Sequence, residues 1–217
     1  MPDRVFTELQ RDALQEIANL GMGQAATRLS GLLNAFIELS VPRVRVVAVS
    51  EAAAALREMT GIDGPVAAVR QGFRSEIKGE ALVICRSGEI AELGSLVGGR
   101  ADDHDDEAHH GTPGVDDALT EEELMFDVAN ALTGACVSSM LDQLGRMPIF
   151  SQPGLLGEAI MLDQVFQPGL LAWDVALLVE VNFALEDQRF RAHLVMLMAE
   201  ESIHVVSRAI DALLHSL

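Results

Sequence analysis

The sequence is poor in the residues that build disulfide frameworks and base-stacking surfaces. Its 217 residues include two cysteines, one tryptophan, no tyrosine and only 4% aromatic residues in all. Two cysteines without a CxxC motif exclude a disulfide framework, and both Cys85 and Cys136 lie in apolar or small-residue segments. They are therefore predicted to be reduced and buried, as is typical of a cytoplasmic protein. The scarcity of aromatic rings argues against a surface on which nucleic-acid bases stack.

Positive charge is scarce as well. Lys and Arg total 15 against 33 Asp and Glu, which gives a formal net charge of -18. Such a field repels polyphosphates, so neither nucleic acid nor an anionic membrane surface is expected as a partner. The N-terminus lacks a basic segment followed by an apolar core, and the charge-free segment 128–141 is too short to cross a bilayer. A soluble, cytoplasmic protein without membrane insertion is predicted.

Apolar residues make up 49% of the chain, which is enough for a folded core. Thr7 and Gln10 form a capping-box pattern before the first helix, and Thr120 and Glu123 form a second one. The first half is predicted to contain a helix over 7–33, strands over 44–49, 66–69 and 79–85, and a helix over 87–96. The second half is predicted to contain a helix over 120–144, strands over 175–185 and 190–198, and a helix over 203–217 capped by Ser202. The order of elements thus occurs twice.

An acidic segment separates the two halves. Residues 100–118 carry a run of Asp and Glu together with His104, His109 and His110. These side chains include metal-ligating types, but their spacing matches no closed metal site, so a solvated loop is the favoured interpretation. We therefore predict a single domain over 1–217, made of two repeats at about 1–99 and 119–217 that the acidic loop joins.

The repeat extends to polar residues that folding does not require. The first set is Asp12, Glu16, Asn19, Gly23 and Pro42, and each member lies 111 positions before its counterpart in the second set, Glu123, Asp127, Asn130, Gly134 and Pro153. In each set the first four fall on one helical stripe about 60° wide. Polar side chains on an amphipathic helix usually form only its wet face. Their recurrence at a constant offset favours a functional stripe.

The chemistry of this stripe suits positioning. A carboxamide both donates and accepts hydrogen bonds and barely titrates, so it can hold a water molecule but is no strong base. A carboxylate three positions earlier on the same helix can grip a cation such as a lysine. The sequence contains no Ser/His/Asp set, glycine-rich phosphate loop or zinc motif.

Residues 9–26 resemble the signature helix of the CheC family of bacterial chemotaxis, which includes CheX and FliY. The family motif is Asp or Ser, three residues, Glu, two residues, Asn, twenty-two residues and Pro, and Asp12, Glu16, Asn19 and Pro42 match it throughout. The duplicated layout is similar to that of CheC itself. The resemblance implies an α/β fold with a pseudo-twofold axis, in which an antiparallel sheet carries the two long helices on its outside.

The resemblance also implies phosphatase activity on the aspartyl phosphate of a CheY-type response regulator. Asn19 and Asn130 would orient the attacking water, and Glu16 and Asp127 would each pair with a lysine of the response regulator. The response regulator would hold Mg²⁺, and this chain would need no metal or cofactor of its own. The second copy departs from the motif, because Asp127 stands in place of Glu. The side chain of Asp is one methylene group, or about 1.5 Å, shorter than that of Glu.

A second hypothesis is that the stripe only binds. As an alternative, the chain would be a non-catalytic adaptor, because the resemblance also extends to proteins that interact with the CheD deamidase or with a flagellar switch component. On this hypothesis the same residues form a docking surface and contribute little catalysis.

Overall fold

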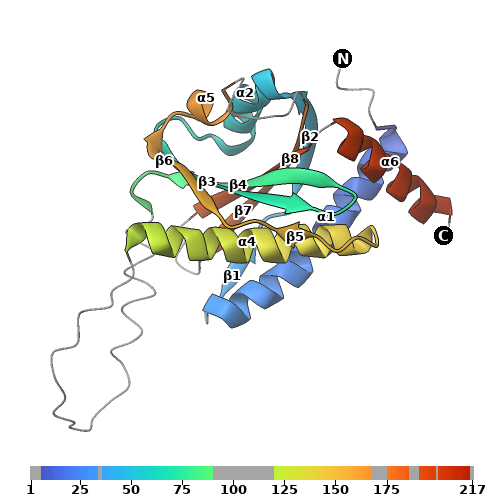
Figure 1. Ribbon diagram of the computed structural model, residues 1–217, viewed down its shortest axis with the longest axis horizontal. Coiled ribbons are helices and arrows are strands. Elements are labelled where there is room, and N and C mark those ends of the chain that lie inside the picture. Colours follow the sequence, from blue (N-terminus) through green and yellow to red (C-terminus); the bar gives the residue numbers. More distant parts are fainter. Residues whose placement is uncertain are drawn as a thin grey trace, which may run out of the picture.

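An antiparallel sheet forms the centre of the fold, and helices cover both of its faces (Figure 1). The computed structural model describes residues 6–33, 36–89, 120–167, 175–185, 191–198 and 200–215. In chain order the elements are α1 (Glu8–Leu33), β1 (Ile37–Leu39), β2 (Arg43–Ala48), α2 (Val49–Thr60), β3 (Val66–Arg74), β4 (Lys78–Arg86), α4 (Glu121–Gln143), β5 (Ile149–Phe150), β6 (Gly154–Ile160), α5 (Leu162–Val165), β7 (Val175–Leu185), β8 (Arg191–Met198) and α6 (Glu200–His215).

The strand order has an internal twofold symmetry. Within the described residues the order is β1-β7-β8-β4-β3-β5, with β2 also paired to β7 and β6 to β3. Exchanging β1 with β5, β2 with β6, β3 with β7 and β4 with β8 gives the same order read from the opposite edge of the sheet. The predicted α/β fold with an antiparallel sheet and two related halves is therefore confirmed. The boundaries at residues 99 and 119 and the loop between them lie outside the described residues and stay a prediction.

The sheet is buried on both faces because its strands alternate between two apolar clusters. Along β3, Ala67 and Val69 belong to a cluster shared with α1, α4 and α6, whereas Val66 and Ala68 belong to one shared with α2 and α5. A period of two residues sends successive side chains to opposite faces, so β3, β4, β7 and β8 each contribute to both clusters. The two long helices thus form an outer layer on one face, as the resemblance to the CheC family implied (Figure 1).

Both predicted capping boxes are present. Thr7 and Gln10 exchange hydrogen bonds of 2.8 and 3.2 Å at the start of α1, and Thr120 and Glu123 do the same at 2.9 and 3.2 Å before α4. The hydrogen bonds from the Thr120 backbone and hydroxyl lower the pKa of the Glu123 carboxyl group. These caps satisfy amide groups that a helix terminus leaves unpaired, and they fix where each long helix begins.

The crossing of α1 and α4 depends on Gly21. A Cβ atom at this position would lie 3.0 Å from the backbone nitrogen and from Cγ of Met140. The absence of a side chain therefore lets the two helices approach closely over the same face of the sheet. Gly23, two positions on, has no neighbour within 4 Å of such an atom and lies on the exposed face.

Five elements were not predicted: α2, β6 and α5, and the short strands β1 and β5. Val49 was assigned to a strand, but it begins the helix α2, whose N-cap residue Ala48 makes no side-chain hydrogen bond. The usual start signal is therefore missing, although Gly61 ends the helix in the left-handed conformation with φ of 67°. The strand β6 and the short α5 also went unpredicted, because β6 is half-buried without a clear alternation.

One further prediction about a helix is wrong, and another is not tested by the described residues. Ser202 was predicted to cap the last helix, but α6 begins at Glu200, and the buried Ser202 hydroxyl accepts a 2.9 Å hydrogen bond from the Lys78 amide. The hydroxyl therefore joins α6 to β4 and does not start the helix. The helix predicted over 87–96 lies outside the described residues beyond Glu89.

Both cysteines are buried and free, as predicted. Cys85 lies 3.9 Å from the sulfur of Met125, and burial raises the pKa of each thiol to about 12. For Cys85 the nearby charge of Glu89 adds to this effect. The thiolate is the reactive form, so neither thiol is suited to nucleophilic or redox chemistry.

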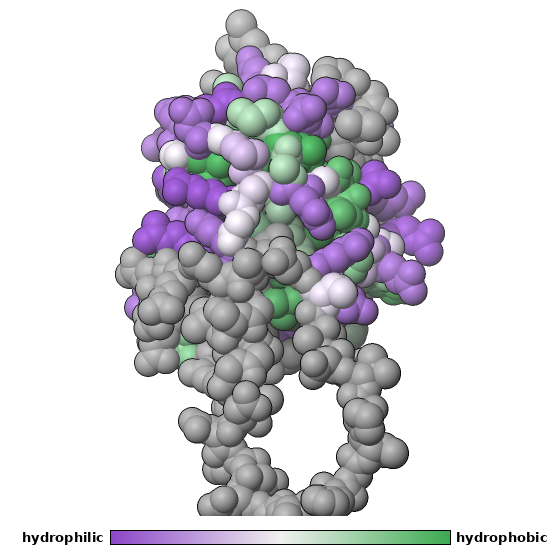
Figure 2. Space-filling model, turned by 90° about the vertical axis from the view of Figure 1, so that its left-hand side faces the viewer, coloured by the Kyte–Doolittle hydropathy of each residue, from purple (hydrophilic) through white to green (hydrophobic). Residues whose placement is uncertain are grey.

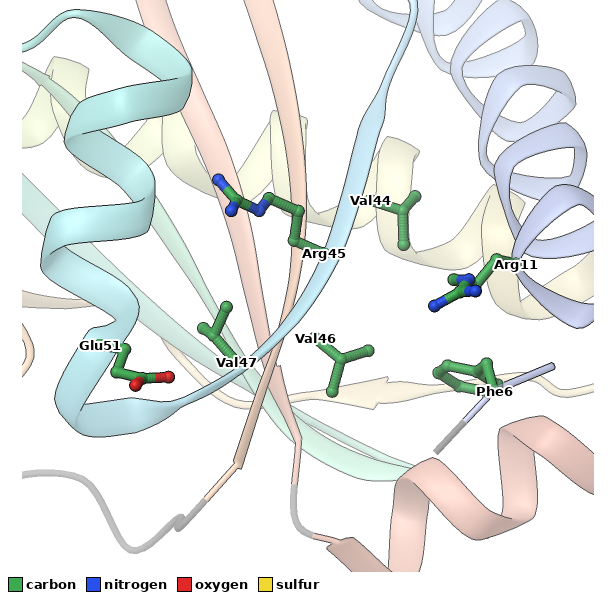
Figure 3. Close-up of a pocket in the computed structure, with 7 residues that line it drawn as sticks. All are labelled: Phe6, Arg11, Val44, Arg45, Val46, Val47 and Glu51. Carbon is green, nitrogen blue, oxygen red and sulfur yellow. The ribbon is translucent and has the colours of Figure 1, made fainter. Parts of the chain in front are cut away.

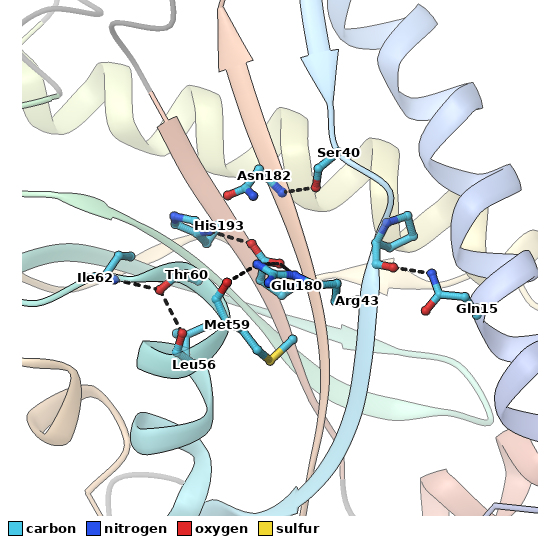
Figure 4. A network of polar contacts seen from close by, with 11 residues as sticks. Gln15, Ser40, Arg43, Leu56, Met59, Thr60, Ile62, Glu180, Asn182 and His193 are labelled. Atoms are coloured by element: carbon cyan, nitrogen blue, oxygen red, sulfur yellow. Dashed lines mark hydrogen bonds and ion pairs between the residues drawn. The ribbon is translucent and has the colours of Figure 1, made fainter. Parts of the chain in front are cut away.

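A buried polar network holds β2 against the central strands (Figure 4). Glu180 of β7 is fully buried and makes contacts of 2.8 Å with both the Arg43 guanidinium and Nδ1 of His193. Arg43 also donates to the Met59 carbonyl at the end of α2. The network therefore joins three strands and the C-terminus of a helix around one carboxylate.

In the coloured part of the face that Figure 2 shows, hydrophilic side chains surround a central area in which several apolar side chains are visible. Among the described helices, the segment Glu122–Gln143 of α4 is long and apolar enough to cross a membrane, but 67% of its apolar 18-residue window is buried inside the protein. Its apolar residues pack against α1 and the sheet, as expected of a core helix.

Alanine substitutions at the two glycines of α1 should have opposite effects. Gly23→Ala adds a methyl group in open space and should raise the free energy of unfolding by roughly 0.5–1 kcal/mol through helix propensity. Gly21→Ala must displace the Met140 backbone and should lower it by about 1 kcal/mol despite the same propensity gain. Urea denaturation measures both. Equal stabilisation by the two variants would contradict the close packing of α1 on α4.

Removing the Arg43 side chain should leave His193 as the remaining described partner of the buried Glu180 carboxylate. Because the Arg43 side chain is itself half-exposed, Arg43→Met is expected to lower the free energy of unfolding by about 2 kcal/mol, and adding Glu180→Gln should recover part of that loss. Arg45→Met is the matched control, because Arg45 pairs with the exposed Glu58, and it should cost less than about 1 kcal/mol. A double variant less stable than Arg43→Met would contradict the assigned role of the Glu180 charge.

Candidate functional site

The polar stripe of α1 lies on the solvent-facing side of the helix. Asp12, Glu16 and Asn19 are exposed, whereas Leu14 and Ile17 between them are buried against the core. The structure describes no hydrogen bond or ion pair of the Asn19 side chain with another described residue. Because the opposite face of α1 is fixed by packing, the helix presents these polar groups from a rigid base.

The loop that carries Pro42 lies beside this stripe. Gln15, adjacent to Glu16, donates a hydrogen bond to the Pro42 carbonyl, and Pro42 directly precedes β2 (Figure 4). The same loop is held to β7 by two reciprocal 3.0 Å hydrogen bonds between Ser40 and Asn182. Pro42 directly precedes β2 and Pro153 directly precedes β6, so each proline ends a loop before a strand.

The second stripe shows the same exposure on α4. Glu123, Asp127 and Asn130 are all exposed, and Glu123 is engaged in the capping box. Beside them lies a groove of about 510 Å³. It is lined by Phe126, Asp127, Asn130, Phe150, Ser151, Gln152 and Pro153. The groove therefore brings together the acid, the amide and the proline of the second motif.

One residue at this groove was not predicted. Gln71 of β3 is 2% exposed, and its Nε2 donates to Asn130 Oδ1 at 2.8 Å and to the Ser151 carbonyl at 2.9 Å. The strand was predicted to end at residue 69, which left Gln71 outside it. The one signal in the sequence that could have identified Gln71 is its place as a polar residue at an inward position of the strand.

Each stripe therefore combines an outward carboxylate and an outward carboxamide one turn apart. Such a pair can bind a cation and orient a water molecule, but it offers no nucleophile and no strong base. Within the described part of the chain, no group of three His, Cys, Asp or Glu residues could hold a metal ion. His104, His109 and His110 lie outside that part.

A separate hollow of about 420 Å³ lies between the start of α1, β2 and the start of α2 (Figure 3). Its lining includes Phe6, Arg11 and Arg45, and none of the four predicted site residues contributes to it. Arg45 is already paired with Glu58 at 2.8 Å. The hollow is therefore distinct from both motif stripes.

Residues 9–46 match a family model described as the CheC-like family. Over these residues the chain is similar to the CheC-like family. Its resemblance to the CheC family, inferred from residues 9–26, is confirmed. The match contains Glu16 and Asn19, whereas the second motif lies beyond it.

Known relatives of this CheC-like chain include proteins of the flagellar switch. It is 27% identical to the flagellar motor switch phosphatase FliY of Bacillus subtilis (strain 168) over 185 residues, which cover 83% of this chain but 43% of FliY. The chain thus spans less than half the length of that relative.

Two solved structures show the same fold. Thermotoga maritima FliY gives a TM-score of 0.64 at 18% identity, covering 95% of this chain and 98% of that one. The FliM middle domain from H. pylori gives 0.58 at 8% identity, covering 94% and 99%. At these identities the likeness establishes the α/β architecture and nothing about chemistry.

Proposed function

We propose that this CheC-like chain is a phosphatase that hydrolyses the aspartyl phosphate of a CheY-type response regulator in the cytoplasm. The observation that carries the proposal is the paired exposure of Glu16 with Asn19 and of Asp127 with Asn130 on two capped, packed helices. A helix buried in the core could not reach the active site of another protein. The name of the FliY relative supports the same activity.

The proposed reaction requires alignment more than chemical activation. Water attacks the phosphorus atom in line with the bond to the aspartyl oxygen, that bond breaks, and the receiver carboxylate and inorganic phosphate are released. Asn19 or Asn130 hydrogen-bonds the water and holds it on this line. An acceleration of about a hundredfold corresponds to roughly 2.7 kcal/mol, which one positioned water can supply.

The acidic residues serve to dock the substrate. Glu16 and Asp127 each bind a lysine of the response regulator, which sets the helix in register with the phosphoryl group. Local complementarity of this kind is needed because the chain carries a net charge of -18. On this proposal Mg²⁺ is held by the response regulator, and within the described part of the chain no group of three His, Cys, Asp or Glu residues could hold a metal ion of its own.

The two sites differ in reach. Asp127 is about 1.5 Å shorter than the glutamate of the first motif, so its carboxylate stays nearer to α4. We expect the second site to dock the same response regulator less tightly, or to suit a different one. The open space at Gly23 and at Gly134, where an added Cβ has no neighbour within 4 Å, leaves room for a partner to approach both helices.

A binding role is the second candidate. Leu20 and Val41, beside the first motif, are 50% and 68% exposed, which favours a protein contact at this place. The partner would be a flagellar switch component, in line with the name of the FliY relative, or a CheD-type deamidase. On this alternative the partner stays bound and no phosphate is released.

Alanine at the two asparagines should separate the candidates. Asn19→Ala and Asn130→Ala should each lower the rate of phosphate release, and the double variant should return it to the intrinsic rate of the phosphorylated receiver. The measurement is phosphate release from a purified CheY-type receiver, phosphorylated in the presence of Mg²⁺, with and without the protein.

Gln24→Ala provides the matched control. Gln24 is also an exposed carboxamide on α1, but it lies about 140° around the helix from Asn19. Its variant should keep the full rate, and the free energy of unfolding of both single α1 variants should change by less than about 0.5 kcal/mol. A double asparagine variant with an unchanged rate would overturn the proposed phosphatase. Retained receiver binding without any hydrolysis by the unmodified protein would favour the adaptor.

A further inference from the structure

Asn130 is held from behind by a buried glutamine, and this contact fixes which end of its carboxamide faces outward. The Ser151 carbonyl oxygen only accepts hydrogen bonds, so the Gln71 atom 2.9 Å from it must be the amide nitrogen. That nitrogen only donates, so the Asn130 atom 2.8 Å from it must be the oxygen Oδ1. The Nδ2 group of Asn130 is consequently the end left for the groove.

Gln71 contributes to this arrangement through its amide group alone. Both protons of Nε2 are engaged, one by Asn130 and one by Ser151, while the buried Oε1 accepts no hydrogen bond from the described residues. The side chain is 2% exposed on a central position of β3. The sheet therefore fixes the position of the Gln71 side chain, and the hydrogen bond from Gln71 in turn restricts the motion of the Asn130 carboxamide.

Among the described residues, the first motif has no equivalent of Gln71. Ser40 exchanges two backbone-anchored hydrogen bonds with Asn182, and Ser151 exchanges the same two with Gly72, so Asn182 and Gly72 are counterparts. The preceding residues, Val181 and Gln71, then occupy equivalent inward positions. Val181 is buried and cannot hydrogen-bond a carboxamide.

We propose that Gln71 is a positioning residue that preorganises Asn130, so that the second site presents its carboxamide in one fixed orientation while Asn19 is ordered only by the docked partner. The proposal rests on the proposed phosphatase function for its kinetic consequence. Fixing a reacting group before the substrate arrives removes an ordering step from the barrier and is expected to raise kcat more than it lowers KM.

The kinetic test isolates the second site in an Asn19→Ala background. Gln71→Met keeps the volume of the side chain and removes both donors, and we expect kcat for phosphate release to fall roughly tenfold with KM changed less than twofold. Gln71→Val, which copies the residue of the first half, should give the same result if the methionine variant unfolds. With Asn19 present, Gln71→Met should add nothing to Asn130→Ala.

The structural test does not depend on catalysis. In the unmodified protein, side-chain ¹⁵N relaxation should show a rigid amide group at Asn130 and a mobile one at Asn19, and Gln71→Met should make Asn130 as mobile as Asn19. A mobile Asn130 amide in the unmodified protein would overturn the positioning role whatever the rates. If the Asn130 amide is rigid in the unmodified protein and becomes mobile in Gln71→Met while kcat stays the same, the catalytic importance of this positioning would be overturned. An unmodified protein that releases no phosphate would overturn the proposed function and the kinetic part of this proposal with it, while the relaxation data would still decide the structural part.

Discussion

The close approach of α1 and α4 over one face of the sheet determines where both motif stripes lie. Each long helix buries one side against the sheet and the other helix, and Gly21 lets the two backbones come within contact at Met140. Because the buried side of each helix is fixed, the rotation of the helix about its axis is fixed too. The acid and the amide on the opposite side are then held outward without any loop of their own to support them.

The symmetry of the fold is close but not uniform along the chain. The motif residues of α1 and α4 are 111 positions apart, whereas the strand pairing relates Gly72 to Asn182, an offset of 110. A shift of one residue in a strand sends every side chain to the other face. An offset of 111 would pair Gln71 with Asn182, two carboxamides, but the hydrogen bonds pair it with the buried Val181. The two sites are therefore alike in their helix residues and different in the strand residues that lie behind the helices.

Much of the architecture could be predicted because local chemistry determined it. The capping boxes at Thr7 and Thr120 marked both long helices, and alternation marked β7 and β8. The helix α2 could not be placed by the same signals, since Ala48 supplies no cap. The contacts of Glu180 with Arg43 and His193 join residues more than ten positions apart in sequence, and no spacing rule connects them. The exposed stripes were predictable, whereas the support beneath Asn130 came from a strand 59 positions away.

On the proposed function, the two sites bind a response regulator in different ways, because they differ in the length of the acidic side chain and in the ordering of the carboxamide. Glu16 has the longer side chain, which favours affinity at the first site. Asn19 is free to adjust, so part of that binding free energy is offset by the cost of ordering its amide when the partner binds. Asp127 has the shorter reach, but Asn130 is already ordered by Gln71, so less of the binding free energy is needed to align the water. A partner whose lysine lies close to the helix would favour the second site, and one with a more distant lysine would favour the first. The duplication thus permits two specificities on one scaffold, because the helices share their geometry while the residues behind them do not.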